Sequence, residues 1–535
     1  MTDKGKGGIS EHWKVLGFML LGVLVGLWMQ WKLEAPAWLG LEVAPAQDGV
    51  RVVRVQPGSP AAKKGIAVGD HLRGAVSHRG TPEEQVLPLR TPGDLTVGVL
   101  EQAGQGEVLW LLPAREPESP LPAETFDPQT DEAIALTVAL SPQSQRARWI
   151  APFTFAADLF IALLKMLIVP VVLSSIVAGI AGVGAMSELS RLGTKTFAYY
   201  IATSLLAIFV GQILVNVVRP GDGAQLGLAY QPFHGEVGGG QYLEVIQRMV
   251  PQNVFTALGD NSAMLAIIFF ALLLGLAITR SDEPHRTRMQ EWFESLNVIM
   301  MKLAAGVLHL LPYGVFALMV KVVAGTGFAP FKALLVYMLT VTAALVLHAC
   351  VTLPLILRFI GRLNPLLWFK AMQPALLTAF STSSSSMTLP VTMETVQTRG
   401  RVSKKVGSFT LPLGATINMD GTALYECIGV IFLAQYYATV GGAPLTMGDQ
   451  GLIVVLALLA SIGAAGIPSA GLVMMLTILS ALHLPTEGAM LLLAVDRPLD
   501  MLRTVVNVWS DSCGAAVVAR SEGEEGPAQP ALDVL

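Results

Sequence analysis

The sequence predicts an all-α polytopic membrane protein with a small β-rich domain inserted near its N-terminus. Of the 535 residues, 53% are hydrophobic and 14% are charged, whereas soluble domains average about 25% charged residues. Apolar runs of membrane length recur along the chain. Much of the charge lies in one segment between the first two runs. The net charge of −4 gives no large basic surface for nucleic acid, which is therefore not expected as a partner.

Eight apolar runs are long enough to cross a bilayer as helices. The first lies within residues 1–31. It is expected to be retained, because it is longer than the apolar part of a usual signal peptide and no good cleavage site follows it. The other seven centre on residues 159–185, 199–218, 264–278, 298–320, 333–357, 407–438 and 488–520.

Two further apolar segments are interrupted by small residues and a proline, "LLTAFSTSSSSMTLPVTM" and "LALLASIGAAGIPSAGLVMML". Lipid offers no partner for the backbone groups that such breaks release, so these segments must lie against protein or water. They are expected to form two re-entrant hairpins, over residues 373–398 and 450–484. The span at 407–438 is expected to be a broken helix, because its "NMDGT" tolerates non-helical conformations.

The basic residues of the short loops predict the orientation. With the N-terminus inside, every basic loop falls on the cytoplasmic side, and loop 439–449, which contains no basic residue, falls outside. Residues 521–535 then form a cytoplasmic tail of a multi-pass protein in the cell (inner) membrane. The two hairpins enter from opposite sides, which is the inverted-repeat pattern of a secondary transporter with its site near mid-membrane. The loop residues are Arg191, Lys195, Arg280, Arg286, Arg288, Arg358, Arg362, Lys370, Arg399, Arg401, Lys404 and Lys405.

The charged early segment alternates as strands do in "VRVVRV", "LTVGVL" and "VLWLLP". Its "WLGLEV" and "VQPGSPAAKKGIAVGDHL" resemble a PDZ domain of bacterial periplasmic proteins, over residues 38–113. The resemblance implies that Leu39, Gly40 and Leu41 bind the terminal carboxylate of a peptide that adds as a strand; a purely structural cap is the alternative. The orientation places this domain outside the cytoplasm, and the Pro- and acid-rich residues 114–149 are expected to be a linker.

The last span carries six polar residues at offsets 0, 4, 7, 8, 11 and 15, which fall within about 100° of one helix face. A charged residue in the bilayer centre costs roughly 3 kcal/mol on insertion scales, so this stripe must face protein or water. Carboxylates together with carbonyls freed by the broken helix suit Na⁺, and the arginine suits an anionic organic solute. The stripe consists of Asp496, Asp500, Arg503, Thr504, Asn507 and Asp511.

The motifs "SSSSMTLPVTM", "LPLGATINMDGTALYE", "SIGAAGIPSAG" and "LDMLRTVVNVWSDS" resemble the dicarboxylate/amino acid:cation symporter family. The excitatory amino acid transporters and the archaeal aspartate transporters belong to this family. The resemblance covers residues 150–520 and the first helix. It implies a homotrimer, not an enzyme, that imports L-glutamate or L-aspartate with Na⁺ and H⁺ by an elevator-type movement.

The resemblance also assigns the site residues. For the substrate, Asp500 would bind the amino group and Arg503 the side-chain carboxylate, assisted by Thr422, Thr504, Asn507 and the backbone of Ser383, Ser385, Ile467 and Gly471. One sodium site would use Asp511 with carbonyls of Gly414, Asn418 and Asn507. A second would use Asp420 and Asn418 with Tyr200, Thr203 and Ser204. A third would use the carbonyls of Thr416, Ser461, Ile462 and Ala464.

Glu426 is expected to carry the co-transported proton. The proton-coupled members of the family have Glu at this position, whereas sodium-coupled archaeal members have Gln. A carboxyl that is buried beside the ligand site can exchange a proton between the two orientations of the carrier. A protonated packing residue is the alternative.

The chain departs from the family pattern at one charge. The family has an arginine either just before the serines or just after the aspartate of the last helix, whereas this chain has Ser383 and Met501 there. Arg497 stands one turn earlier, and the sequence leaves open whether it replaces the missing arginine.

A C4-dicarboxylate or neutral amino acid symporter of the same family is the alternative substrate class. A membrane protease is not favoured, because the eight histidines form no H-E-x-x-H motif and no G-x-S-x-G motif occurs.

Overall fold

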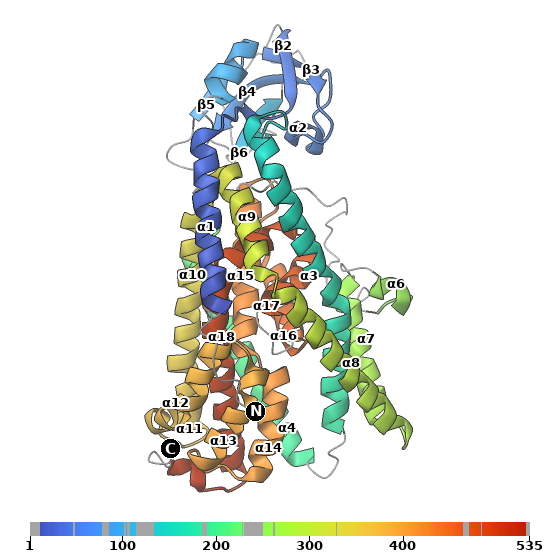
Figure 1. The fold of residues 1–535 in the computed structure, drawn as a ribbon, viewed down its shortest axis with the longest axis vertical. Helices are drawn as coiled ribbons and strands as arrows, with labels where there is room; N and C mark the ends of the chain where they lie inside the picture. Colours follow the sequence, from blue (N-terminus) through green and yellow to red (C-terminus); the bar gives the residue numbers. More distant parts are fainter. Residues whose placement is uncertain are drawn as a thin grey trace.

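The structure is a computed structural model that describes residues 11–46, 49–77, 85–100, 103, 108–113, 133–184, 190–226, 228, 250–259, 263–327, 329–463, 470–482 and 484–530. It is mostly helical. Long helices run side by side, and a small strand-rich domain lies at one end of the bundle (Figure 1). The expected combination of apolar helices and an N-terminal β-sheet region is therefore present.

One set of helices, called here the peripheral group, packs around α3 and α9. The helix α1 lies along α9, while α3 contacts α7, α8 and α9. The short α6 (Val254–Leu258) packs on α7. The group consists of α1 (Glu11–Lys32), α3 (Gln145–Gly184), α7 (Met264–Thr279), α8 (His285–Leu308) and α9 (Leu311–Thr326).

A second set, the central group, packs around α15 and α18. Almost all of α15 is buried, although it contains both Asp420 and Glu426. The group consists of α4 (Ser190–Val218), α10 (Ala329–Leu347) with its continuation through His348–Thr352 into α11 (Leu353–Phe359), α12 (Pro365–Thr382), α13 (Ser385–Thr398), α14 (Lys404–Ile417), α15 (Asp420–Thr439), α16 (Met447–Gly463), α17 (Ala470–Ala481) and α18 (Glu487–Ser521).

The breaks in the central group fall where the small and polar residues predict them. The helices α12 and α13 pack on each other and are joined at Ser383 and Ser384. The Ser384 side chain caps α13 by accepting a hydrogen bond from the backbone N–H of Met387 at 3.3 Å. Between α14 and α15, Asn418 and Met419 leave the helical conformation. Residues 464–469, between the packed α16 and α17, lie outside the described part of the chain.

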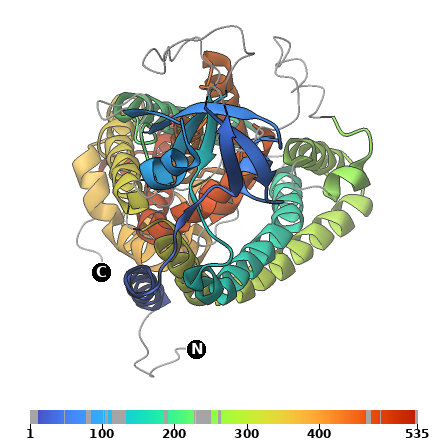
Figure 2. The same ribbon diagram turned by 90° about the horizontal axis from the view of Figure 1, so that it is seen from above.

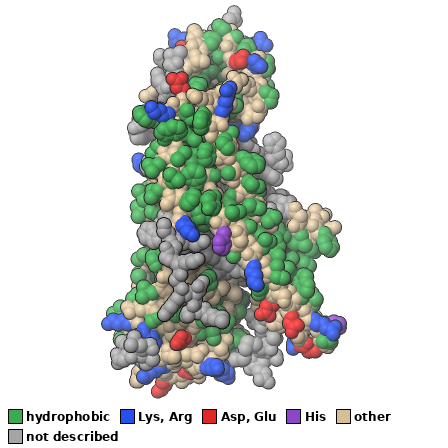
Figure 3. Space-filling view, viewed as in Figure 1, with side chains coloured by type: hydrophobic (Ala, Val, Ile, Leu, Met, Phe, Trp, Pro, Cys, Tyr) green, Lys and Arg blue, Asp and Glu red, His purple; other side chains and the backbone are tan. Residues whose placement is uncertain are grey.

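The eight expected spans remain a prediction. Within the described residues, three helices are long and apolar enough to cross a membrane alone, Arg191–Val218, Pro330–Phe359 and Lys404–Thr439, and α8 with α9 gives a fourth if the bent pair is one span. Shorter apolar helices lie in α1, α3, α7 and α16. Figure 3 shows apolar side chains over the middle of the bundle and charged ones towards its ends. Re-entry of the two hairpins also remains a prediction.

The segment between α1 and α3 forms the strand domain, defined here as β1 to β8 with their connections. A six-stranded antiparallel sheet runs in the order β2-β3-β4-β6-β7, with β5 paired to β4, and β1 pairs with β8. The strands are β1 (Ala37–Trp38), β2 (Leu41–Ala46), β3 (Gly49–Val55), β4 (His71–Ser77), β5 (Gln85–Pro88), β6 (Val108–Pro113), β7 (Ile134–Thr137) and β8 (Ala139–Leu140). The short helix α2 (Pro60–Lys63) follows β3.

The domain extends beyond residue 113, where the sequence predicts its end. In the range expected to be a linker, β7 pairs with β6 and buries Leu136 in the domain core. The strand expected at "LTVGVL" is wrong: Asp94–Leu100 is a short helix. The Asp94 carboxylate accepts hydrogen bonds from the backbone N–H groups of Arg90 and Thr91 and so turns the chain. Leu95 and Val99, four residues apart, then face the core together.

The strand domain is attached firmly to the peripheral group. The Arg146 side chain, near the start of α3, donates hydrogen bonds of 2.9 Å to the carbonyls of Leu33 and Gln30 at the end of α1. Leu140 of β8 packs against a cluster that includes Val320 of α9. Seen from above, the domain lies over the helix bundle (Figure 2).

Candidate cation and substrate site

The polar stripe of α18 faces the interior of the central group. Its six residues are 1% to 5% exposed, and α18 packs against α15, α14 and α4 on this side. The prediction from their spacing, that these side chains share a face directed away from lipid, agrees with this burial. They form two clusters, one around carboxylates and one around Arg503.

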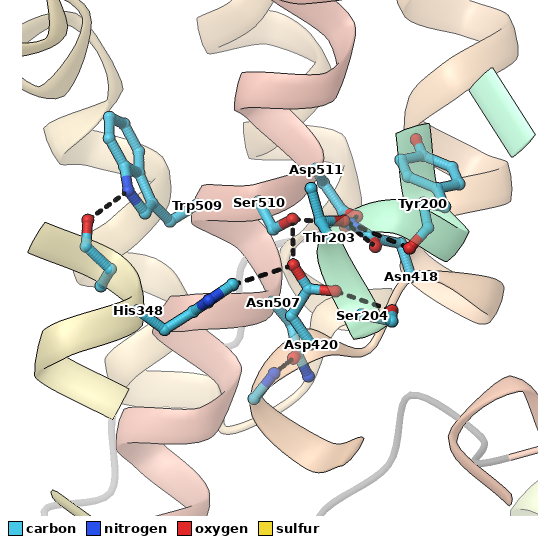
Figure 4. A network of polar contacts seen from close by, with 12 residues as sticks. Tyr200, Thr203, Ser204, His348, Asn418, Asp420, Asn507, Trp509, Ser510 and Asp511 are labelled. Atoms are coloured by element: carbon cyan, nitrogen blue, oxygen red, sulfur yellow. Dashed lines mark hydrogen bonds and ion pairs between the residues drawn. The ribbon is translucent and has the colours of Figure 1, made fainter. Parts of the chain in front are cut away.

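Asp420, at the first turn of α15, is the centre of the carboxylate cluster (Figure 4). One of its oxygens accepts a hydrogen bond from Ser204 Oγ at 2.7 Å. The other accepts one from Ser510 Oγ at 2.6 Å and lies 3.2 Å from His348 Nε2. The neighbouring Asn418 Oδ1 accepts a hydrogen bond from Thr203 Oγ1 at 3.3 Å. The break before α15 thus brings together groups from α4, α18 and the turn after α10.

Asp511 lies beside this network. Its Oδ1 accepts a hydrogen bond from Asn418 Nδ2 at 2.9 Å. A Cβ added to Gly414 would overlap this carboxylate and would lie 2.7 Å from Tyr200 Oη. Tyr200 itself donates to the carbonyl of Thr410 at 2.7 Å. Gly414 is therefore the small residue that leaves room between the two oxygen-bearing side chains.

The two carboxylates lack fixed cationic partners. Among the residues that the structure describes, no lysine or arginine forms an ion pair with Asp420 or Asp511. Both are at most 3% exposed. A buried, uncompensated carboxylate is strongly unfavourable, so a bound cation would offset the cost. The surrounding ligands are oxygens, which hard cations prefer.

The third expected sodium site is only partly described. Thr416 and Ser461 lie on α14 and α16, which pack on each other. Their hydroxyls donate to carbonyls of their own helices, Leu413 at 3.0 Å and Leu458 at 2.9 Å. Ala464 and the side chain of Ile462 lie outside the described residues.

Arg503 is the centre of the second cluster. Its Nη2 lies 2.7 Å from Asp500 Oδ1 and 3.0 Å from Asp496 Oδ1. Its guanidinium carbon lies 3.9 Å from the ring centroid of Tyr425, a cation–π contact. Arg497 also reaches this cluster, with Nη1 3.3 Å from Asp500 Oδ2.

The other nitrogens of the guanidinium are buried. Nη1 and Nε of Arg503 have no hydrogen-bond acceptor among the described residues. A Cβ on Gly471 of α17 would lie 2.6 Å from Nη1 and 3.1 Å from Thr422 Cγ2. Thr422 Oγ1 accepts a hydrogen bond from Asn507 Nδ2 at 3.3 Å. The predicted residues Gly471 and Thr422 therefore lie on the Nη1 side of Arg503, and Asn507 is bonded to Thr422. Thr504 lies one turn along and donates to the carbonyl of Asp500 at 2.8 Å.

The tip of the first hairpin carries a strained residue. Ser383 has φ of 51°, which is uncommon for a residue with a side chain. Its hydroxyl is buried and has no hydrogen-bond partner in the described part of the chain. Ser385 is buried at the start of α13, which packs against α18. Ile467, expected at the second tip, lies outside the described residues.

Glu426 lies on α15, four residues after Thr422. Its side chain is fully buried, and neither carboxyl oxygen has a hydrogen-bond partner among the residues that the structure places. Arg503 lies close enough to affect it electrostatically. A buried carboxyl without donors is poorly suited to stay ionised.

Three residues of these two clusters, Ser510, His348 and Tyr425, were not predicted from the sequence. Ser510 lies at the edge of the α18 stripe, so a wider arc would have included it. His348 is a histidine inside an apolar span, which is itself a signal for function. It starts a stretch of π-helical turn, His348–Thr352, and such turns are frequent at functional sites. Tyr425 carried no signal beyond being next to Glu426.

The predicted peptide loop lies at the edge of the sheet. Carbonyls of Leu39 and Gly40 accept hydrogen bonds from the N–H groups of Ala61 and Gln56. Gly40 has φ of 77°, and a Cβ there would overlap Ser59, so glycine is required. Leu41 begins β2, which is the terminal strand of the sheet order.

The model of the sodium:dicarboxylate symporter family matches residues 132–521. Excitatory amino acid transporter 2 of Mus musculus is 36% identical over 421 residues, which cover 68% of this chain and 72% of the relative. Excitatory amino acid transporter 1 of Ambystoma tigrinum is 33% identical over 447 residues (72% and 80%), and excitatory amino acid transporter 3 of Homo sapiens 33% over 424 (70% and 80%). The chain belongs to the sodium:dicarboxylate symporter family.

Proposed function

We propose that this protein imports acidic amino acids together with Na⁺, by alternating access. The main support is a buried arginine, Arg503, whose Nη1 has no acceptor among the described residues, in the same helix group as Asp420 and Asp511, two buried carboxylates without a lysine or arginine partner in that part of the chain. Such a site binds an anionic solute and cations together. The excitatory amino acid transporters to which the chain is similar are named for the same substrate class.

The substrate would lie between Arg503, Thr422 and the two hairpin tips. Nη1 of Arg503 can donate a charge-assisted hydrogen bond to a substrate carboxylate, and a turn of the side chain that directs Nη1 and Nη2 to it together would make the pair bidentate. Asp500 would accept the amino group, and Arg497 beside it would keep the local charge balanced when Arg503 turns towards the substrate. Uptake of labelled L-aspartate and L-glutamate by proteoliposomes under separate Na⁺, H⁺ and K⁺ gradients tests this function. Uptake of succinate or serine in their place would favour the alternative substrate classes.

The cations would occupy the two oxygen-rich places around Asp420 and Asp511. In this proposal His348 donates its Nε2 hydrogen to Asp420 and orients the carboxylate, as outer partners commonly do for cation ligands. Ser510 does the same from α18.

Gly414→Ala is expected to weaken sodium binding strongly. The added methyl group would occupy the space between Asp511 Oδ1 and Tyr200 Oη. We expect half-maximal aspartate uptake to require at least tenfold more Na⁺. The matched control is Gly407→Ala on the same helix, where a Cβ meets Gln397 Nε2 at 3.4 Å, an ordinary contact. If the sodium dependence of uptake were unchanged in both Gly414→Ala and the control, Gly414 and Asp511 would not be part of the cation site.

We further propose that the central group is the moving unit of a homotrimer, and that the peripheral group stays with the membrane. The support is the packing: each group is more extensively packed within itself than against the other. Glu426 would be the proton carrier. Mass photometry of the purified protein in detergent tests the trimer.

The strand domain would capture a peptide C-terminus at Leu39, Gly40 and Leu41. The open side of β2 could accept an added strand. Because β7 and β8 belong to the domain, residues 37–140 are the unit to remove. We expect their replacement by a short Gly/Ser linker to leave a folded trimer with at least half of the wild-type aspartate uptake. A trimer that assembles normally but takes up no aspartate would show that the strand domain is needed for transport.

A further inference from the structure

The strand domain bridges the two helix groups. Its chain ends continue into α1 and α3 of the peripheral group, where Arg146 and Leu140 hold it. Its opposite side reaches the loop that joins α15 to α16 in the central group. A Cβ on Gly441 of that loop would lie 3.3 Å from Ala135 Cβ of β7 and 3.8 Å from Lys64 Nζ.

The contact with the central group is loosely packed. Trp110 of β6 shares a cavity of about 780 Å³ with Gly441, Leu445 and the end of α4 at Arg219. Lys64 is half-buried here, and burial lowers the pKa of its ammonium group. This space is partly open to solvent, so the two sides share fewer atom–atom contacts than a close-packed interior does, and separating them loses less contact energy.

We propose that residues 439–446 form a docking surface for the strand domain, and that this contact must open and close in each transport cycle. The inference rests on the proposed movement of the central group against the peripheral group. Because the strand domain is fixed to the peripheral group, its contact with a loop of the central group cannot persist when the groups shift. The strand domain is therefore a clamp that favours the arrangement seen in the structure.

Joining the two sides covalently tests the clamp. In a Cys350→Ser background, which removes the exposed native cysteine, Ala135→Cys and Gly441→Cys bring two thiols together. Mercuric ion bridges adjacent thiols, and excess dithiothreitol removes it. We expect the bridge to reduce Na⁺-driven aspartate uptake into proteoliposomes at least tenfold, with recovery after dithiothreitol. Binding of labelled aspartate to the bridged protein should persist, because the substrate site is not touched.

Leu140→Cys with Gly325→Cys is the matched control. A Cβ on Gly325 lies 3.9 Å from Leu140 Cδ1, so this pair joins the strand domain to α9 of the peripheral group, which it already follows. Its bridge should leave uptake unchanged. Each single cysteine variant reports the effect of substitution alone, which matters at Gly441 because its φ is 98°. Gly442→Cys, at the same cavity, replaces it if the strained position prevents folding.

Two results would overturn the clamp. One is a bridge between residues 135 and 441 that leaves uptake at the unbridged level. The other is failure of the bridge to form although each single cysteine reacts with a thiol reagent. Absence of aspartate uptake before any bridge is formed would contradict the proposed function itself, so the two failures are distinguishable.

Discussion

Arg503→Cys is expected to abolish uptake of aspartate and glutamate. The guanidinium of Arg503 is buried, and its Nη1, which has no acceptor among the residues that the structure describes, can meet the substrate's second carboxylate. Charge-assisted pairs contribute roughly 1.5–3 kcal/mol or more, and each 1.4 kcal/mol is a factor of ten. We expect kcat/KM for aspartate to fall at least a hundredfold, and small neutral amino acids such as serine to become substrates. Competition of unlabelled serine and aspartate for transport measures both effects.

Loss of folding must be separated from loss of recognition in this variant. Removing Arg503 leaves Asp496 buried without its partner, which is itself destabilising. The double variant Asp496→Asn/Arg503→Cys relieves this charge and should also fail to transport aspartate. Arg520→Cys is the matched control: Arg520 lies in the last turn of the same helix, where it donates to the carbonyl of Glu524, and its replacement should leave aspartate uptake unchanged. If Arg503→Cys took up aspartate as the wild type does, Arg503 would not bind the substrate carboxylate.

The helical part of the fold was largely predictable because burial and periodicity coincide in it. Asp500, Arg503 and Asn507 lie on one stripe of an apolar helix. Such a stripe must face the protein interior, because lipid does not solvate polar groups. The breaks at Ser383 and Asn418 follow from residue types that leave helical conformations readily. Family membership, inferred from these motifs, is confirmed by the comparisons.

The remaining features depend on contacts between distant parts of the chain. His348 lies 72 residues before Asp420, and no local periodicity indicates that they meet. The apolar residues from Leu95 onward fit the alternation of a strand and also the four-residue spacing of a helix. The helix forms because the Asp94 carboxylate turns the chain just before it. The strand at Ile134 follows a Pro- and acid-rich stretch, which concealed its pairing with β6.

Glu426→Gln is expected to separate proton coupling from substrate exchange. Gln keeps the size of the side chain and its hydrogen-bonding capacity but cannot exchange a proton. Glu426 is fully buried near Arg503, and its two carboxyl oxygens have no hydrogen-bond donor among the described residues. A carboxyl in this position can load a proton with the substrate and release it on the other side, which return of the empty carrier requires.

The measurement is aspartate uptake by proteoliposomes with an imposed pH gradient at fixed Na⁺. In the wild type, an inwardly directed proton gradient should accelerate net uptake severalfold. In Glu426→Gln this response should disappear, while exchange of labelled for unlabelled aspartate across the membrane should continue at a similar rate. Glu487→Gln, at the exposed start of α18, is the control and should keep the response. A Glu426→Gln protein that retained the wild-type response to the pH gradient would show that the proton is carried elsewhere, and that Glu426 is a packing residue.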